Sequence, residues 1–339
     1  MSGAAGGLAT ETAELVRAGG SHVGPLMARV EQRLRGATAG HGPVLARHAG
    51  ATIAAGGKRL RPLLVLLAGG APGDEQQAES LVRAGAAVEL VHSATLVHDD
   101  VLDAASLRRG RPTVVAAAGA PLAIATGDLL FAQAFAGLTE ELPGGRRPPG
   151  AGAAVSMLSD ACSALARGEL VQRADAWDAG VTRERYLHRC ELKTARLFEA
   201  ACLLGARAIG EDPAGLGAFG RGIGLAFQLL DDVLDVAGPS SRTGKHRGTD
   251  LLDGTVTLPF IVARRADPQL AELDPRSLTT PEAAEQVCEA IAATGALDEV
   301  RALALEQVAG AKRELPASLG TERRAALELV ADGVVRRYS

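Results

Sequence analysis

Three aspartates, Asp99, Asp100 and Asp103, stand together at the end of an apolar stretch, ELVHSATLVHDDVLD, that has helical periodicity. At about 100° per residue, Asp99 and Asp103 lie about 40° apart around the helix axis and one turn apart along it. Two carboxylates stacked in this way repel each other unless a cation lies between them. The spacing therefore indicates a cation-binding site.

The same arrangement returns far downstream in FQLLDDVLDV, as Asp231, Asp232 and Asp235. A single acidic patch is commonly a solvated helix face, but both copies lie among Leu and Val residues, where solvation would be poor. Hard divalent cations, Mg²⁺ foremost, suit all-oxygen sites that leave coordination positions for phosphate. The sequence predicts two carboxylate clusters that bind Mg²⁺.

Cationic residues form separate groups along the chain. The segment GGKRLRP stands at a predicted helix start, where backbone N–H groups add their own preference for anions. The candidates are Lys58, Arg61, Arg108, Arg109, Lys193 and Lys245. Each alone is typical of a surface charge, but basic groups interleaved with acidic metal sites indicate two polyanions, one bridged by metal and one held by cationic side chains. Two diphosphates meet that requirement.

Two polar residues share helix faces with the aspartates. His92 lies seven residues before Asp99, two turns back on the same face, and both a binding role and an ordinary core role are open for it. Gln228 lies three residues before Asp231, so its amide is expected to point into the second acidic cluster. Neither a Walker loop nor a kinase signature is present.

The chain as a whole has the composition of closely packed helices. It has 339 residues, of which 47% are hydrophobic and only 3% aromatic, and no sustained period-two strand pattern is evident. We expect helices over residues 22–36, 42–55, 60–70, 74–104, 119–141, 151–174, 182–208, 213–237, 255–266, 281–294, 297–314 and 321–337. Residues 1–20 are predicted to be a flexible N-terminal segment, and residues 21–339 a single domain.

Charge and cysteine usage exclude other classes. The net charge of −4 gives no general basic field, so a nucleic-acid partner is not expected. Four scattered cysteines without a CxxC pair favour reduced thiols over a disulfide framework or a zinc site. No basic region followed by an apolar core stands at the N-terminus, and apolar runs such as 62–70 are too short for a bilayer. We expect a cytoplasmic protein without a transmembrane segment.

The motifs resemble those of the trans-isoprenyl diphosphate synthase (polyprenyl synthetase) family. The matching segments are GGKRLRP, ELVHSATLVHDDVLDAASLRRGRPT, GELVQ, YLHRCELKTARLFEAACLLGA and GLAFQLLDDVLDV, in the family's order from about residue 56 to 260. A single DDxxD also occurs in class I terpene cyclases, whereas the paired motif with GKRLRP, RRG and KT is specific. The resemblance implies an all-α fold of antiparallel helices around a deep central cavity, usually in a homodimer.

It also implies an activity, the head-to-tail condensation of isopentenyl diphosphate with an allylic diphosphate (geranyl, farnesyl or geranylgeranyl). By resemblance, the metal residues are Asp99, Asp100, Asp103, Asp231, Asp232 and Asp235. Arg108, Lys193 and Lys245 would contact the allylic diphosphate, and Lys58, Arg61, His92 and Arg109 would hold isopentenyl diphosphate. Thr194 and Gln228 would flank the allylic cation that forms when diphosphate leaves.

Product length depends on the residues one turn before Asp99. In the family, bulky aromatics there stop elongation early, whereas this chain has Ala94 and Thr95, which suggests geranylgeranyl or longer products. Phe131 and Phe135 are either a floor further down or ordinary core residues. In GELVQ, Glu169 and Gln172 share one helix face, and a place near the substrate is slightly favoured for them.

One departure from the family pattern stands in GTDLLDGTVTLP, where Thr255 replaces the usual Lys after the Gly. Arg242, His246 and Arg247 are near in sequence and are candidates to replace its charge. The alternatives are a class I terpene cyclase or head-to-head condensing enzyme, against which the second DDxxD argues, and a weakly active regulatory subunit, which only Thr255 supports.

Overall fold

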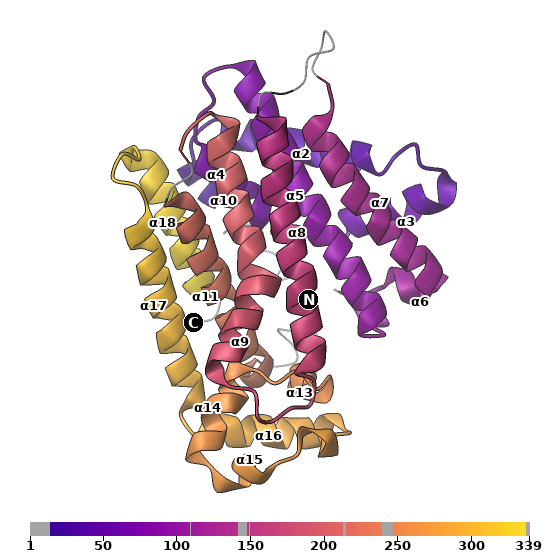
Figure 1. Cartoon of the computed structure of the whole chain (residues 1–339), viewed down its shortest axis with the longest axis vertical. Helices are drawn as coiled ribbons and strands as arrows, with labels where there is room; N and C mark the ends of the chain where they lie inside the picture. The colour runs from indigo at the N-terminus through magenta and orange to yellow at the C-terminus, as the bar shows by residue number, and fades with distance from the viewer. Residues whose placement is uncertain are drawn as a thin grey trace. The chain divides into compact units, whose positions relative to one another are not determined.

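The computed structural model of this chain describes residues 14–108, 110–141, 148, 150–212, 215–238 and 247–336. The described part is built almost entirely from helices, so the fold is all-α, as predicted (Figure 1). The longer helices are α2 (Val23–Ala37), α3 (Pro43–Ala54), α4 (Leu60–Gly69), α5 (Glu75–Leu102), α7 (Ala120–Thr139), α8 (Ala151–Ala174), α10 (Arg196–Ala208), α11 (Leu216–Ala237), α16 (Pro281–Ala293), α17 (Ala296–Glu314) and α18 (Thr321–Arg336).

The shorter elements are α6 (Val114–Ala118), α9 (Arg183–Cys190), a π-helical segment (Glu191–Ala195), α13 (Thr249–Leu252), α14 (Leu258–Ala266), α15 (Pro268–Glu272), a 3₁₀ turn (Pro275–Ser277) and the antiparallel pair β1 (Leu107–Arg108) and β2 (Arg111–Pro112). Apolar periodicity predicted the long helices to within a few residues but missed most short elements. Several of them begin at a side-chain cap, as where the Thr113 hydroxyl accepts a hydrogen bond from the amide of Ala116.

The helices form two compact units that interleave along the sequence. Unit 1 consists of the described residues of Met1–Cys162, Leu197–Gly217 and Leu315–Leu329, and unit 2 of those of Ser163–Arg196, Ala218–Glu314 and Val330–Ser339. The single domain expected over residues 21–339 stays a prediction. So does the flexible segment over residues 1–20, of which residues 1–13 lie outside the described part.

Unit 1 is organised around α5, which packs against α2, α4 and α7 (Figure 1). The helix begins after Asp74, whose carboxylate accepts a hydrogen bond from the amide of Gln77 and so satisfies a donor of the first turn. Small and aliphatic residues of α5 are buried from Ala78 to Val97. Burial of this long apolar surface fixes the helix that ends in the first aspartate cluster.

Unit 2 contains α9, the π-helical segment, most of α11, and α14 to α17. Gly222 allows α11 and α17 to approach closely, because a Cβ at that position would lie 2.9 Å from the Cβ of Ala311. In α11 the aliphatic residues Leu229, Leu230 and Val233 are buried. The helix that carries the second aspartate cluster is thus held by its apolar face.

Within the described residues, α7 is the one helix long and apolar enough to cross a membrane, with a mean hydropathy of 1.4 over its most apolar stretch. The sequence analysis did not identify α7 as a possible membrane span, because polar residues such as Asp128 interrupt its apolar residues. Helix α7 packs extensively against α5, although only 33% of this apolar stretch is buried, and a single such helix is weak evidence for a membrane span.

The cysteines have the predicted character. All four are free thiols; Cys190, Cys202 and Cys288 are buried, and Cys162 is half-buried. The expectation of scattered thiols without a disulfide framework is confirmed.

Candidate active site

The first aspartate cluster lies at the C-terminal end of α5. Asp99 and Asp100 belong to the last turn, and the helix ends at Leu102, so Asp103 follows as the capping residue and its amide donates to the carbonyl of Asp99 at 2.8 Å. Asp99 is half-buried and Asp103 is exposed. The carbonyl ends of the helix add partial negative charge to the carboxylates, and this field favours a cation.

Asp100 differs from its neighbours because it is buried, with 4% of its surface exposed. Its carboxylate accepts a hydrogen bond from Nε of Arg108 at 2.6 Å. The β1–β2 pair positions that arginine, which was predicted to contact the allylic diphosphate. Asp100 therefore orients a cationic side chain in this structure. Arg109, the next residue, lies outside the described residues.

The predicted isopentenyl diphosphate residues divide into two groups within unit 1. His92 lines a pocket together with Asp100 and Arg108. Lys58 stands half-buried just before α4, and the guanidinium of Arg61 lies 4.5 Å from the ring centroid of Phe198, in a cation–π contact. Neither Lys58 nor Arg61 is among the residues that line the His92 pocket.

Arg59, which the motif analysis passed over, fixes the backbone of GGKRLRP. It caps α4 in a left-handed conformation with φ of 49°. Its guanidinium donates to the carboxylate of Glu31 at 2.5 Å, to that of Glu89 at 2.7 Å and to the carbonyl of Ile53 at 2.9 Å. Because a non-glycine residue adopts this conformation only at a cost, these bonds indicate that Arg59 positions the residues beside it.

The second aspartate cluster lies on α11 in unit 2. Asp231 and Asp235 are half-buried, and the carboxylate of Asp235 accepts a hydrogen bond from the amide of Asp250 at 3.2 Å. That bond ties the segment containing α13 to the end of α11. Whether the two clusters face each other across a cavity stays a prediction, as do the metal roles of all six aspartates.

Asp232 is fully enclosed and belongs to a chain of hydrogen bonds. Thr194 Oγ1 donates to Gln228 Oε1 at 2.7 Å, Gln228 Nε2 donates to Asp232 Oδ1 at 2.8 Å, and the hydroxyl of Tyr186 donates to Asp232 Oδ2 at 2.5 Å. Burial, together with the charge of Asp250, raises the pKa of Asp232 to about 7. The amide of Gln228 does point into the acidic cluster, and its orientation is set from both ends.

Replacing Tyr186 by Phe is expected to destabilise the protein in a pH-dependent way. A carboxyl whose pKa is raised by folding favours the folded state most at low pH, and this contribution is lost as the pH rises towards 7. The Tyr186 hydroxyl stabilises the ionised form of Asp232, so its removal raises that pKa further. We expect a loss of about 1–3 kcal/mol in unfolding free energy at high pH and a smaller loss at low pH.

Urea unfolding at about pH 8.5 and about pH 5 measures this difference. An equal loss at both pH values would show that the hydroxyl does not act on the ionised carboxylate.

Lys193 and Thr194 lie in the π-helical segment, a form that is rare and is often found at functional sites. Nζ of Lys193 donates to the carboxylate of Glu169 at 2.5 Å, and Arg173 donates to the same carboxylate at 2.7 Å. Burial alone would raise the pKa of Glu169, but these two cations outweigh it and hold the pKa below its usual value. Glu169 thus holds Lys193 in place, which supports the interpretation of GELVQ as a site motif.

Gly168, the residue before Glu169, is required by close packing. A Cβ there would lie 2.7 Å from the amide nitrogen and 2.9 Å from the Cα of Lys193. These are backbone atoms, which cannot rotate away as a flexible side chain could. The π-helical segment can therefore pack this closely against α8 only because residue 168 has no side chain.

Thr255, the departure from the family pattern, is half-buried, and its amide donates to the carbonyl of Asp250 at 2.8 Å. The neighbouring Val256 carbonyl accepts a hydrogen bond from the buried Arg189 at 2.6 Å. Arg247, a candidate to replace the missing charge, donates to the carbonyl of Val236 at 2.9 Å and lies 3.8 Å from Glu285. It is engaged elsewhere; Arg242, Lys245 and His246 lie outside the described residues.

The predicted chain-length residues occupy α5 and α7 in unit 1. Ala94 is fully buried, and the hydroxyl of Thr95 donates to the carbonyl of His92 at 2.8 Å. Phe131 and Phe135 are both half-buried, and the ring of Phe131 lies 5.8 Å from that of His98. Their role in product length stays a prediction.

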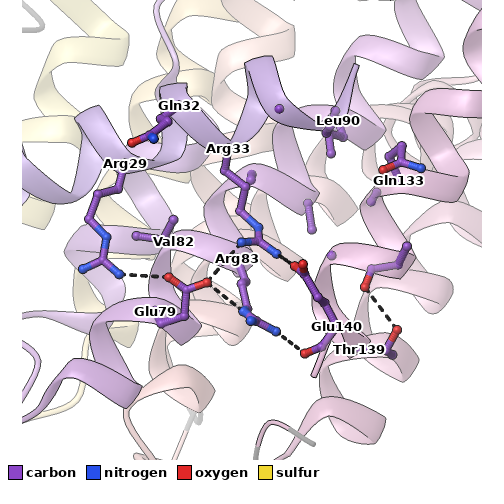
Figure 2. Close-up of a pocket in the computed structure, with 17 residues that line it drawn as sticks. Arg29, Gln32, Arg33, Glu79, Val82, Arg83, Leu90, Gln133, Thr139 and Glu140 are labelled. Carbon is purple, nitrogen blue, oxygen red and sulfur yellow. Dashed lines mark hydrogen bonds and ion pairs between the residues drawn. The ribbon is translucent and has the colours of Figure 1, made fainter. Parts of the chain in front are cut away.

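A larger pocket in unit 1, of about 780 Å³, lies between α2, α5 and α7 (Figure 2). None of the predicted site residues lines it. Its arginines are paired within the unit: Arg29, Arg33 and Arg83 all donate to the carboxylate of Glu79. Figure 2 shows that these ion pairs join α2 to α5, and that Arg33 also pairs with Glu140, directly after α7, so they have a structural role.

Comparison with known proteins places these features in a family. Residues 43–294 match the family model described as polyprenyl synthetase. The octaprenyl diphosphate synthase of Escherichia coli (strain K12) is 35% identical over 84% of this chain and 87% of its own length. A decaprenyl diphosphate synthase from Rhodobacter capsulatus superposes with a TM-score of 0.85 at 31% identity, covering 97% of this chain and 99% of that one.

The structure of a polyprenyl synthase from Caulobacter crescentus, complexed with calcium and isoprenyl diphosphate, superposes with a TM-score of 0.82 at 34% identity, covering 97% of this chain and 98% of that one. The family match and a relative named as a prenyl diphosphate synthase identify this chain as a prenyltransferase. The chain belongs to the polyprenyl synthetase family.

Proposed function

We propose that this enzyme condenses isopentenyl diphosphate head-to-tail with an allylic diphosphate and releases an all-trans prenyl diphosphate of geranylgeranyl length or longer. The observation that carries the proposal is that both aspartate clusters, the π-helical Lys193–Thr194 pair and Gln228 all fall within the family match over residues 43–294. The octaprenyl and decaprenyl names of the two synthases support a long product, and so do the small residues Ala94 and Thr95.

The aspartates suit Mg²⁺. The donors are all oxygen, and within the described residues no three His, Cys, Asp or Glu side chains come close enough to hold a metal by themselves. Mg²⁺ is usually bound by one or two carboxylates and completes its octahedron with water and phosphate oxygens, so an incomplete protein site fits it. Asp99, Asp103 and Asp231 are the residues that would hold it. When bound, Mg²⁺ would withdraw charge from the departing diphosphate.

The cationic side chains would bind and orient the allylic diphosphate. Arg108 and Lys193 are each held by a carboxylate, Asp100 and Glu169 respectively, so both positive groups are positioned before a ligand arrives. Because both side chains are already held in place, they lose less conformational entropy when they bind the diphosphate. The allylic C–O bond would then break with its electron pair leaving on diphosphate. The double bond of isopentenyl diphosphate would attack the allylic cation, and the new cation would lose a proton to the departed diphosphate.

Thr194 and Gln228 would stabilise the allylic cation. The hydrogen-bond chain from Tyr186 through Asp232 fixes the Gln228 amide so that its oxygen faces Thr194. The oxygen dipoles are therefore set before the cation forms, which is the condition under which they contribute most. Thr194 is buried, and a dry environment protects the cation from attack by water.

We also propose that the enzyme acts as a homodimer in the cytoplasm. Helix α7 supports the first part because its apolar sequence is only partly covered: 33% of its most apolar stretch is buried, and Ile124 is 46% exposed. An uncovered apolar helix in unit 1 is a suitable surface for a second copy. Mass measurement in solution tests the oligomer.

Incubation with labelled isopentenyl diphosphate and farnesyl diphosphate, followed by mass analysis of the products, tests the reaction. We expect prenyl diphosphates of 20 carbons or more, formed only when both substrates are present. Conversion of farnesyl diphosphate to a hydrocarbon without isopentenyl diphosphate would instead identify a cyclase or head-to-head enzyme. A pure protein inactive under all these conditions would support the regulatory subunit.

A further inference from the structure

Arg189 is a buried arginine of unit 2 that was not among the predicted site residues. It belongs to the last turn of α9 and is 3% exposed. Its Nη2 donates to the carbonyl of Val256, the residue after Thr255, at 2.6 Å. Its guanidinium carbon also lies 5.3 Å from the ring centroid of Tyr186, in a cation–π contact. One positive group therefore contacts both the turn around Thr255 and the tyrosine that donates to Asp232.

A second contact holds the same turn, which consists of residues 254–256. The backbone amide of Trp177, in the loop after α8, donates to the carbonyl of Gly254 at 2.8 Å. A Cβ at Gly254 would overlap the indole ring, so the ring packs directly on the backbone of the turn. Trp177 itself has a left-handed backbone with φ of 64°, a conformation that bulky residues adopt only where the surroundings enforce it. Arg189 and Trp177 thus fix the turn by independent contacts.

Asp175, which is 2% exposed, is the buried acidic neighbour of Arg189. Its Oδ1 accepts a hydrogen bond from Nε of Arg185 at 2.5 Å, and its Oδ2 lies 4.0 Å from Nη1 of Arg189. Among the described residues, neither this Oδ2 nor this Nη1 has a hydrogen-bond partner. Replacing a buried ion pair by well-packed apolar residues commonly leaves stability unchanged or raises it. A contribution to stability therefore does not account for the charge of Arg189, which favours a role in the site.

Tyr186 connects Arg189 to the residues that are proposed to act on the allylic cation. The ring of Tyr186 contacts the guanidinium, and its hydroxyl donates to Asp232 Oδ2 at 2.5 Å. The other carboxylate oxygen of Asp232 accepts a hydrogen bond from the amide of Gln228 at 2.8 Å, and Gln228 in turn accepts one from Thr194. A shift of the tyrosine ring would therefore pass through two hydrogen bonds to the amide of Gln228.

The turn is also tied to the second aspartate cluster. The amide of Thr255 donates to the carbonyl of Asp250 at 2.8 Å, and the amide of Asp250 donates to the carboxylate of Asp235 at 3.2 Å. These residues all belong to unit 2. Arg189 therefore closes a circuit of contacts that runs from α9 through the turn and α13 to α11, and back through Tyr186.

We propose that Arg189 is a positioning residue of the condensation, which holds Tyr186 and residues 254–256 in one fixed arrangement. The inference rests on the proposed function, because Gln228 and Thr194 have their roles only in that reaction. With Tyr186 held, the oxygen of Gln228 keeps its orientation before the allylic cation forms, and the cation meets dipoles that need no rearrangement. Arg189 acts through Tyr186 and the turn, not on the substrates.

Trp177 provides a direct readout, because it is the only tryptophan in the chain and packs on the turn. Full-length wild type, Arg189→Met and Arg189→Lys are compared by tryptophan emission and by quenching with acrylamide. We expect Arg189→Met to release the turn, move the emission to longer wavelength and raise the quenching constant about twofold. Lysine keeps a donor for the Val256 carbonyl and a charge for the ring of Tyr186, so Arg189→Lys should stay closer to the wild type.

Steady-state kinetics separate positioning from a general loss of structure. We expect Arg189→Met to lower kcat about tenfold and to change KM for either diphosphate by less than about twofold. The KM values should hold because Arg108 and Lys193 keep their carboxylate partners. Tyr186→Phe should also lower kcat, since it releases Asp232 from the same chain of hydrogen bonds. If Arg189 acts through Tyr186, the double variant is no slower than the slower single variant.

Arg276→Met is the matched control, since that side chain is 68% exposed, and it should equal the wild type in emission and rate. Arg189→Gln loses the charge but stays polar beside Asp175; it is expected to behave as Arg189→Met and replaces it if the methionine variant does not fold. A lower melting temperature with unchanged emission and kcat, or two losses in kcat that multiply in the double variant, would overturn the proposal. An inactive wild type would refute the proposed reaction, while the emission of Trp177 would still show whether Arg189 holds the turn.

Discussion

Asp99→Ala and Asp231→Ala are each expected to lower kcat by about 10³-fold, because metal stabilisation of a leaving group is worth several kcal/mol. Each substitution removes one of the carboxylate oxygens that we propose bind Mg²⁺. Both aspartates are only half-buried, and their removal relieves repulsion between like charges. The helical fold should therefore remain intact.

Steady-state assays over a range of Mg²⁺ concentrations, with circular dichroism as a check on the fold, measure this effect. Asp298→Ala is the matched control, since its side chain is 84% exposed and its ion pair among the described residues is with Arg301 in the same helix. Addition of a chelator should abolish turnover of the wild type. Activity of either variant within tenfold of the wild type, or activity that persists in the chelator, would contradict the assignment of the aspartates to metal.

Helix positions and the polar residues on their faces were the predictable part of this molecule. Apolar periodicity over α5 and α11 is a local property, so it located both aspartate clusters. The position of Gln228 one helical turn before the second cluster placed its amide there, where it donates to Asp232. Glu169 was found because it shares a helix face with Gln172 in a motif. Each of these inferences needs only the geometry of one helix.

Contacts between elements were not predictable in this way. Tyr186 lies 46 residues from Asp232 in sequence, and a tyrosine on a helix gives no sign of which carboxylate it will meet. Arg47 lies on α3 outside every motif, and only the packing of α3 against α5 brings it to His92. The π-helical segment has ordinary helix-forming residues, and its backbone at Lys193 lies against Gly168 of α8. These features depend on contacts between elements that are distant in sequence, and the periodicity of a single sequence contains no information about such contacts.

Gly168→Ala tests the close contact between α8 and the π-helical segment. The added Cβ would meet the amide nitrogen and Cα of Lys193 at 2.7 and 2.9 Å, so α8 and the π-helical segment must move apart. Overpacking of this kind costs about 1–3 kcal/mol of stability. The larger effect is expected on catalysis, because Lys193 and Thr194 move with the backbone, and a displacement of about 1 Å at a positioned group lowers rate about 10²-fold.

The matched control lies in the same helix. Gly152 of α8 is exposed, and a Cβ there would meet no atom within 4 Å, so Gly152→Ala should keep full activity and stability. Melting temperature and kcat for both variants separate the two consequences of the clash. If Gly168→Ala lost stability but kept its kcat, the π-helical segment would be a packing feature alone. A fall in kcat at temperatures well below melting would instead show that the absence of a side chain at Gly168 positions the groups that we propose act on the allylic substrate.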